Sequence, residues 1–283
     1  MVSCRLFEDV DSLTDRQIMS RIVGRSSRLD GYNSKGRLGF IHCPSLTESN
    51  VGDRVCEINE RYLPLIGRLT AVERIIINRT DGTLTAIPPE IGNLTNLKIL
   101  DLGGSFTTLP PELWTLTQLE ELWLGGSLAE FPVEVGQLTN LRGLSLRGDF
   151  TTLAPELGQL TNLEELWISG DFTTLPPELG QLTNLKMLEI SAQVTILPPE
   201  IRHLNNLEVL SIYGHLTELP PEIGQLTNLQ RLELRRNNLT TLPPEIGDLT
   251  NLLVLDLTEN NFITKPPEIQ QLRERGVAVR GFN

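Results

Sequence analysis

Apolar residues recur along most of this chain with a fixed spacing. In the stretch 229–251, LQRLELRRNNLTTLPPEIGDLTN, leucines stand at offsets 0, 3 and 5 from Leu229. The last two, Leu232 and Leu234, alternate with polar residues, which is typical of a strand with one buried face. Two more leucines follow, and then Pro-Pro-Glu and an apolar pair three residues apart. Because prolines suit the first turn of a helix and a following Glu complements the helix dipole, the pattern predicts a strand, a turn and a short helical segment.

This pattern repeats every 22 or 23 residues. The segments 207–228 and 185–206 are nearly the same text, and the similarity continues back to residue 97. One unit of this length cannot bury its apolar face alone, so the copies must stack into a solenoid with a continuous core. Regular units begin at Val72, Leu97, Leu119, Leu141, Leu163, Leu185, Leu207, Leu229 and Leu252.

The repeat text LxxLxLxxNxLxxLPPEIGxLxN resembles the leucine-rich repeat family, over roughly residues 63–272. It is most similar to the intracellular type with repeats of 22–23 residues, found in plant Ras-group-related, Roco-type and bacterial proteins. The resemblance implies an α/β solenoid with a curved parallel β-sheet on its concave side and short helical or 3-10 segments on its convex side. About nine repeats are expected, with a cap at each end, because an exposed sheet edge invites wrong pairing.

The domain organisation follows from where the repeat text starts and stops. Residues 1–62 are expected to form an N-terminal cap with a helix at 12–23, a loop, a strand at 37–43 and a second helix from residue 54. A small separate docking module is the alternative for this segment. Residues 63–271 form the solenoid, and residues 272–283 a C-terminal cap with a charged helix end, a glycine stop and a final strand at 277–279.

The turn after each strand departs from the family pattern in most units. The family places Asn at offset 8, where Asn237 and Asn260 fit. The six preceding units are one residue shorter, lack Asn at this position and carry a small residue just before it: Gly104, Gly126, Gly148, Gly170, Ala192 and Gly214. A small-residue column predicts a tighter turn, which positive φ angles would explain. We therefore expect a change in local curvature or twist near residues 229–237.

A second polar column precedes the strands. We expect its side chains to bond backbone groups at the turn from the helical segment to the strand, which is a structural role. The column consists of Asn96, Gln118, Asn140, Asn162, Asn184, Asn206, Asn228 and Asn251.

Composition narrows the choice of partners and compartment. The net charge is −12, which argues against a general affinity for nucleic acid or anionic membranes. The three cysteines, Cys4, Cys43 and Cys56, all precede the repeats and form no disulfide framework, which favours a reducing compartment. The first residues lack the apolar run of a secretory signal, and no stretch is long enough to span a bilayer. The predicted location is cytoplasmic, with no insertion into a membrane.

The candidate binding site lies on the concave side, where strand offsets 2, 4 and 6 point away from the core. Trp123 and Trp167 both occupy offset 4, two units apart, so we expect them to be about 10 Å from each other, flanking Ser145 and Arg147. Exposed aromatic residues with Arg, Met and Tyr are typical of the centre of a protein interface. Alternatively, the two indoles only cover small residues, or reflect the duplication of one repeat. The proposed site consists of Trp123, Trp167, Arg147, Met187, Tyr213, Glu121, Glu165, Arg231 and Arg235.

Nothing in the sequence points to catalysis. Glu120, Glu121, Glu164 and Glu165 form an acidic flank beside the two Trp, but solvated carboxylates lack the burial that tunes a catalytic pKa. No phosphate-binding loop or nucleophile motif is present, and the spacing of His42, Cys43 and Cys56 matches no zinc pattern. We therefore expect no catalytic residue, no metal and no cofactor. Trp114, on a helical segment, is expected to be a packing residue.

The sequence predicts a non-enzymatic scaffold that binds another protein on its concave sheet. The resemblance to intracellular relatives makes a signalling protein or a GTPase an admissible partner, although no residue identifies it. One alternative is a carbohydrate or small-ligand receptor that uses the two Trp as stacking platforms. Another is a regulatory subunit of a separate enzyme.

Overall fold

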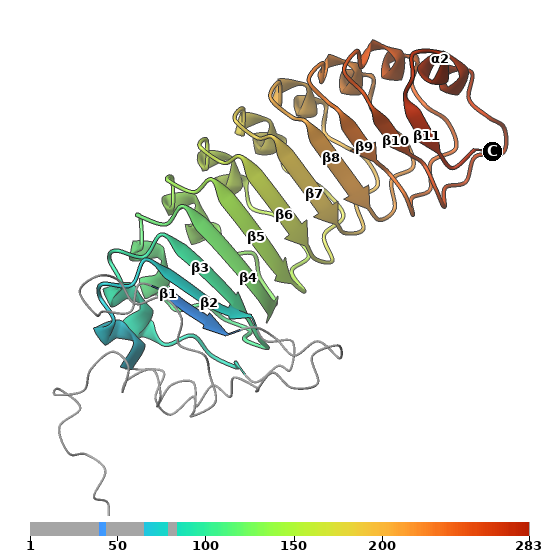
Figure 1. Ribbon diagram of the computed structural model, residues 1–283. Coiled ribbons are helices and arrows are strands. Elements are labelled where there is room, and N and C mark those ends of the chain that lie inside the picture. Colours follow the sequence, from blue (N-terminus) through green and yellow to red (C-terminus); the bar gives the residue numbers. More distant parts are fainter. Residues whose placement is uncertain (1–39, 44–64, 79–83, 283) are drawn as a thin grey trace, which may run out of the picture. The chain divides into compact units, whose positions relative to one another are not determined.

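The computed structural model describes residues 40–43, 65–78 and 84–282 of the chain (Figure 1). The chain divides into two compact units, residues 1–119 and 120–283, and each is described by itself. The helices expected at 12–23 and from residue 54 to 64, the loop between residues 24 and 36, and Cys4 and Cys56 lie outside the described residues.

The first unit contains three parallel strands in chain order. β1 (Phe40–Cys43) pairs with β2 (Arg74–Asn78), and β2 pairs with β3 (Ile99–Gly103). The expected strand near 37–43 is thus present and lies beside the first regular strand. Residues 65–68, in the stretch where the second helix was expected, are in a 3-10 conformation. Two more 3-10 segments follow the repeat text, η3 (Pro89–Asn93) and η4 (Pro111–Thr115).

The second unit continues the same alternation of strands and returning segments. Its strands are parallel and lie in chain order (Figure 1). Paired strands keep equivalent repeat positions in register, except at the end of β4, where a register shift pairs Leu128 with Gly148. They are β4 (Glu121–Leu128), β5 (Gly143–Gly148), β6 (Glu165–Ser169), β7 (Met187–Ser191), β8 (Val209–Tyr213), β9 (Arg231–Glu233), β10 (Val254–Asp256) and β11 (Ala278–Arg280). The helical segments are η5 (Val133–Gln137), η6 (Pro155–Gln159), η7 (Pro177–Gln181), η8 (Pro199–His203), η9 (Pro221–Gln225), η10 (Pro244–Asp248) and α2 (Glu268–Glu274).

The expected short helical segments are 3-10 turns of five residues. Most carry Pro in the first turn and Glu directly after it, and their backbone bonds span three residues, as from the Leu226 N–H to the Ile223 carbonyl at 3.1 Å. Such a segment is too short for a stable α-helix but reverses the chain while satisfying its own amides. It places Ile223 and Leu226 in the core, where both are fully buried.

Identical positions of successive units stack to form the core. The strand leucines Leu144, Leu166 and Leu188 are fully buried, and so are Phe150 and Phe172, whose parallel rings lie 5.9 Å apart. Buried leucines of this kind contribute on the order of 1.5–3 kcal/mol each to stability. The core is therefore a set of ladders, and the side chains at strand offsets 3 and 5 enter them.

The explanation offered for the small-residue column was wrong. In the described residues the column glycines do not have positive φ, and the non-glycine residues that do are Arg236 (60°) and Glu259 (58°), beside the family asparagines. Small residues are needed because the turns of adjacent repeats nearly touch. A Cβ on Gly214 would lie 1.8 Å from the Ala192 carbonyl oxygen, and a Cβ on Gly148 would lie 2.8 Å from the Leu128 carbonyl oxygen. The turn geometry does change at residue 236, and the expected change in curvature stays a prediction.

The asparagine column before the strands does what the sequence predicted. Each side-chain amide of Asn162, Asn184 and Asn206 donates to a backbone carbonyl of the preceding unit, at 2.8–2.9 Å. Asn96, Asn228 and Asn251 make the same contact. These amides link consecutive repeats, which is the structural role expected for the column.

The C-terminal segment contains the expected helix end, stop and strand. After α2, Gly276 has a φ of 88° and ends the helix. The final strand, β11, begins at Ala278, one residue later than predicted, and pairs with β10. The Arg275 guanidinium donates to the Leu249 carbonyl at 2.6 Å. The proposed boundaries of the caps and the solenoid remain predictions.

Candidate functional site

The two tryptophans face the same side of the second unit as the polar strand positions. Trp123 on β4, Ser145 on β5 and Trp167 on β6 are direct neighbours across the strands, and Glu189 on β7 is next in the same row. We call this solvent-facing side, at offsets 2, 4 and 6 of strands β4 to β9, the outer sheet face. It is the side that the sequence analysis expected to be concave. Both indoles are half-buried, so neither is enclosed in the core.

The two indoles are closer than the strand spacing predicts. Their ring centroids are 4.6 Å apart and their planes are tilted by 35°, compared with the expected separation of about 10 Å. The expectation placed the rings directly above their strands, but the small side chain of Ser145 leaves room for them to lean together. Trp123 also reaches over Gly143, since a Cβ there would be 4.0 Å from Cζ2 of the indole. The pair therefore covers small residues and presents one apolar surface to solvent.

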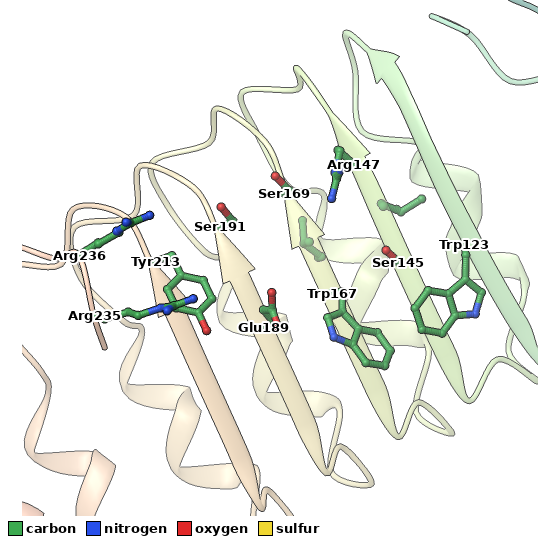
Figure 2. A pocket seen from close by; sticks show the side chains of 12 residues that line it. Trp123, Ser145, Arg147, Trp167, Ser169, Glu189, Ser191, Tyr213, Arg235 and Arg236 are labelled. Atoms are coloured by element: carbon green, nitrogen blue, oxygen red, sulfur yellow. The ribbon is translucent and has the colours of Figure 1, made fainter. Parts of the chain in front are cut away.

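A hollow of about 610 Å³ adjoins the tryptophan pair (Figure 2). Figure 2 shows the tryptophans at one end, Arg235 and Arg236 at the other, and Ser169 and Ser191 between Arg147 and this far end. Its polar lining comes from five consecutive repeat units, which the parallel register places side by side. The lining residues are Trp123, Ser145, Leu146, Arg147, Trp167, Ile168, Ser169, Glu189, Ser191, Tyr213, Arg235 and Arg236.

The structure brings together five of the nine proposed site residues. Trp123, Trp167, Arg147, Tyr213 and Arg235 line the hollow. The other four, Met187, Glu121, Glu165 and Arg231, lie outside it on the outer sheet face at offset 2: Met187 and Glu121 are half-buried, and Glu165 and Arg231 are exposed. Sequence reasoning missed Glu189, Ser169, Ser191 and Arg236 as lining residues. Following the offset-6 row through every unit would have found both serines.

A chain of polar contacts orders the far end of the hollow. The Arg231 guanidinium pairs with the Glu233 carboxylate at 3.2 Å, and the Tyr213 hydroxyl donates to the same carboxylate at 2.8 Å. Arg235 then lies over the Tyr213 ring, 5.0 Å from its centroid. Burial raises the pKa of the Tyr213 hydroxyl, and the bond to Glu233 adds to this effect, so the phenol stays protonated and keeps donating.

Three charged groups in the hollow lack an ion-pair partner. Among the residues that the structure describes, Arg147, Arg235 and the half-buried Glu189 form no ion pair. Arg236, by contrast, pairs with Glu259 at 3.0 Å. Unpaired charges beside an exposed apolar surface can make binding specific, because a partner that covers them without supplying opposite charges binds more weakly than one that supplies them.

Glu164 does not belong to an acidic flank. Its carboxylate pairs with Lys186 at 2.7 Å and with Arg142 at 3.3 Å, both from neighbouring units. The hydrogen bond from Lys186 is the main reason that the pKa of Glu164 is lowered. The signal was present in the alternation of Lys98, Glu120, Arg142, Glu164, Lys186 and Glu208 at offset 1. Glu121 and Glu165 remain without ion pairs in the described part of the chain.

The described residues offer no arrangement for metal chemistry. Residues 40–43, 65–78 and 84–282 contain no group of three or more His, Cys, Asp or Glu that could hold a metal ion. The side chains of His42 and Cys43, considered above as ligands, lie outside the description. Trp114 is 4% exposed and packs in the core, as predicted. In the same ranges, no helix has the length and apolarity needed to cross a membrane.

Family models match two parts of the chain. A model described as a leucine-rich repeat region matches residues 54–175, and a model of two leucine-rich repeats matches residues 227–271. The comparison with curated proteins found no match.

Solved structures resemble the chain more extensively. A leucine-rich repeat protein of Leptospira interrogans is 32% identical over 76% of this chain and 68% of its own, with a TM-score of 0.51. An internalin of Listeria monocytogenes shares the fold at 21% identity, over 78% of this chain and 70% of its own, with a TM-score of 0.63.

A plant receptor ectodomain resembles the chain over a smaller part of its own length. This is the leucine-rich repeat ectodomain of the Arabidopsis thaliana membrane receptor kinase GASSHO1/SCHENGEN3, at 25% identity and a TM-score of 0.66. The match spans 87% of this chain but 32% of the ectodomain. With the stacked repeats and the family models, the likeness to the Leptospira protein shows that this chain belongs to the leucine-rich repeat family.

Proposed function

We propose that the protein is a non-enzymatic scaffold that binds a partner protein on the outer sheet face of its second unit. The observation that carries this proposal is the Trp123–Trp167 pair, an apolar surface that reaches solvent at the edge of the hollow. Paired aromatic side chains with nearby Arg and Tyr are enriched where interfaces concentrate their binding energy. Membership of the leucine-rich repeat family supports protein binding in general.

The comparisons add support to the choice of a protein as the ligand. The plant receptor ectodomain was solved in complex with CASPARIAN STRIP INTEGRITY FACTOR 2. A solenoid can hold an extended partner because successive units present equivalent positions in rows. A signalling protein or a GTPase is the partner class that the sequence resemblance suggests, and a cytoplasmic location is part of the same proposal.

The geometry of the pair disfavours the carbohydrate alternative. A sugar ring stacks on an open aromatic face, and two platforms about 10 Å apart would have flanked one. The indoles instead lie 4.6 Å apart and cover part of each other. A compact apolar surface fits a side chain of a protein better than a sugar ring.

The proposal is tested by removing the indoles. Trp123→Ala with Trp167→Ala should abolish capture of the partner from an extract of the native source, since truncating a central aromatic anchor costs about 2 kcal/mol or more. The matched control is Ile196→Ala, which removes an apolar side chain that is 52% exposed and outside the hollow. Both proteins should keep their thermal transition, because the indoles lie outside the leucine core.

Retention of every captured protein by the double variant would refute the proposal. Quenching of the wild-type Trp fluorescence by glycans, with no protein captured, would support the carbohydrate alternative. Reduced activity of a co-purified enzyme on removal of the scaffold would identify the regulatory-subunit form of the same binding role.

A further inference from the structure

The hollow has the opposite charge balance from the chain as a whole. The chain carries 36 acidic and 24 basic residues, whereas the hollow is lined by three arginines and one carboxylate, that of Glu189. A local excess of positive charge on an acidic protein attracts negative groups, and the low-dielectric walls of a hollow strengthen the field. This contrast points to an anionic occupant.

Arg235 is held in a geometry that leaves its hydrogen-bond donors available. Its guanidinium carbon lies over the Tyr213 ring, 5.0 Å from the centroid, and the ring is fixed through the Tyr213–Glu233 hydrogen bond and the Glu233–Arg231 ion pair. The contact with the ring uses the positive charge of the guanidinium and none of its N–H donors, which form no hydrogen bond or ion pair with the described residues. A carboxylate can therefore bind Arg235 without first displacing an internal ion pair.

Arg147 provides a second cation at the other end of the same row. Arg147, Ser169, Ser191 and Tyr213 occupy consecutive strands in register, and Arg235 follows in the next unit. With strands about 4.8 Å apart, Arg147 and Arg235 are separated by four spacings, about 19 Å. An extended chain rises about 3.3 Å per residue, so about six residues span this distance.

We propose that the hollow binds an acidic, extended segment of the partner protein. One carboxylate of the segment pairs with Arg147, a second pairs with Arg235, and an apolar side chain between or beside them lies on the Trp123–Trp167 pair. This inference rests on the proposed function, because it specifies the part of the partner that occupies the same surface.

The spacing of the two cations favours carboxylates on separate residues over one multiply charged group. Arg147 and Arg235 are too far apart to converge on a single phosphate, and Arg236 is already paired with Glu259. Glu189 lies beside Trp167 in the middle of the hollow and would repel a third acidic residue there. The occupant therefore has acidic ends and a non-acidic centre.

The experiment is selection from a random library of displayed peptides of about twelve residues, twice the span of the row. The target is the full chain, and the best peptide is then labelled and titrated by fluorescence polarisation. We expect Asp and Glu to be enriched over Lys and Arg, with an apolar residue between acidic positions. Arg147→Ala and Arg235→Ala should each weaken binding about tenfold, since each removes one charge-assisted pair.

Further variants test whether the effect is specific to the arginines of the hollow and to the support of Arg235 by Tyr213. Arg142→Ala removes an exposed arginine outside the hollow and should leave the affinity unchanged. Tyr213→Phe keeps the ring under Arg235 but loses the bond to Glu233, and should have a smaller effect than Tyr213→Ala.

Each result decides for or against the acidic segment. Enrichment of basic or uncharged peptides, failure to enrich any sequence, or full affinity in the Arg147→Ala and Arg235→Ala variants would overturn it. If the tryptophan variant loses the peptide or the captured partner while the arginine variants retain it, the proposed function stands and the acidic occupant does not. If neither set of variants changes binding, both fail.

Discussion

Asn237 joins the turn that carries Arg235 and Arg236 to the rest of the second unit. Its side chain is 4% exposed, and its amide donates to the Ile212 carbonyl at 2.7 Å and to the Leu234 carbonyl at 3.0 Å. Its side-chain oxygen accepts from the Leu216 N–H at 2.9 Å. One side chain thus satisfies backbone groups from two consecutive repeats.

Replacing Asn237 by alanine should lower the free energy of unfolding by about 2–4 kcal/mol. The alanine leaves the Leu216 N–H and at least one buried carbonyl without this partner, and each unsatisfied buried group costs about 1–3 kcal/mol. A loss of this size is a large fraction of the 5–15 kcal/mol by which a typical domain is stable. The matched control is Asn184→Ala, because Asn184 is exposed and makes one bond, to the Thr161 carbonyl at 2.8 Å. The control should lose less than about 1 kcal/mol.

The assay is urea unfolding, followed by both circular dichroism and Trp fluorescence. Two probes are needed because repeat proteins can unfold in parts, and the stability difference is defined only where the two transitions coincide. Equal destabilisation by Asn237→Ala and Asn184→Ala would refute the reasoning. It would mean that burial of the asparagine does not set its contribution.

Two further predictions concern the packing of the turns and the response to acid. Gly214→Ala should lower the free energy of unfolding in urea by at least about 2 kcal/mol, because the new Cβ would lie 1.8 Å from a carbonyl oxygen. Gly143→Ala is the control: the nearest atom to its Cβ would be 3.5 Å away, so the free energy of unfolding should change by less than about 1 kcal/mol. Similar losses at the two sites would contradict the close-approach account. Burial acts to raise the pKa of Asp256, but its hydrogen bonds from Thr258 and the nearby charge of Arg280 outweigh this effect and hold the pKa below the ordinary value. A lowered pKa in the folded state stabilises the protein above the unfolded-state pKa, and this contribution is lost as the pH falls through the folded-state pKa. The stability difference between the wild type and Asp256→Asn should therefore be constant near neutral pH and shrink below about pH 4 in unfolding measured across pH; a difference that grows on acidification would contradict it.

The candidate site was only partly accessible from the sequence. The strand period placed Trp123, Trp167 and Arg147 on the solvent-facing side correctly, because alternation along a strand depends on neighbouring residues alone. The same period could not show that the indoles meet at 4.6 Å, since that depends on the space left above Ser145 by a neighbouring unit. The ion pairs of Glu164 were accessible from the sequence but were missed: the alternating charges at offset 1 place Arg142 and Lys186 on the two neighbouring repeats, adjacent to Glu164 across the strands.

The sequence by itself determined the repeat unit, the order of its elements and the residues that form the core. These features are local or periodic, and stacking of near-identical units leaves one arrangement that buries every leucine ladder. The tertiary structure alone decided which polar side chains meet across units, why the turn column requires small residues, and how Tyr213 presents Arg235. These contacts are set by distances between turns and rotamers in different units, which the one-dimensional spacing of residues does not contain.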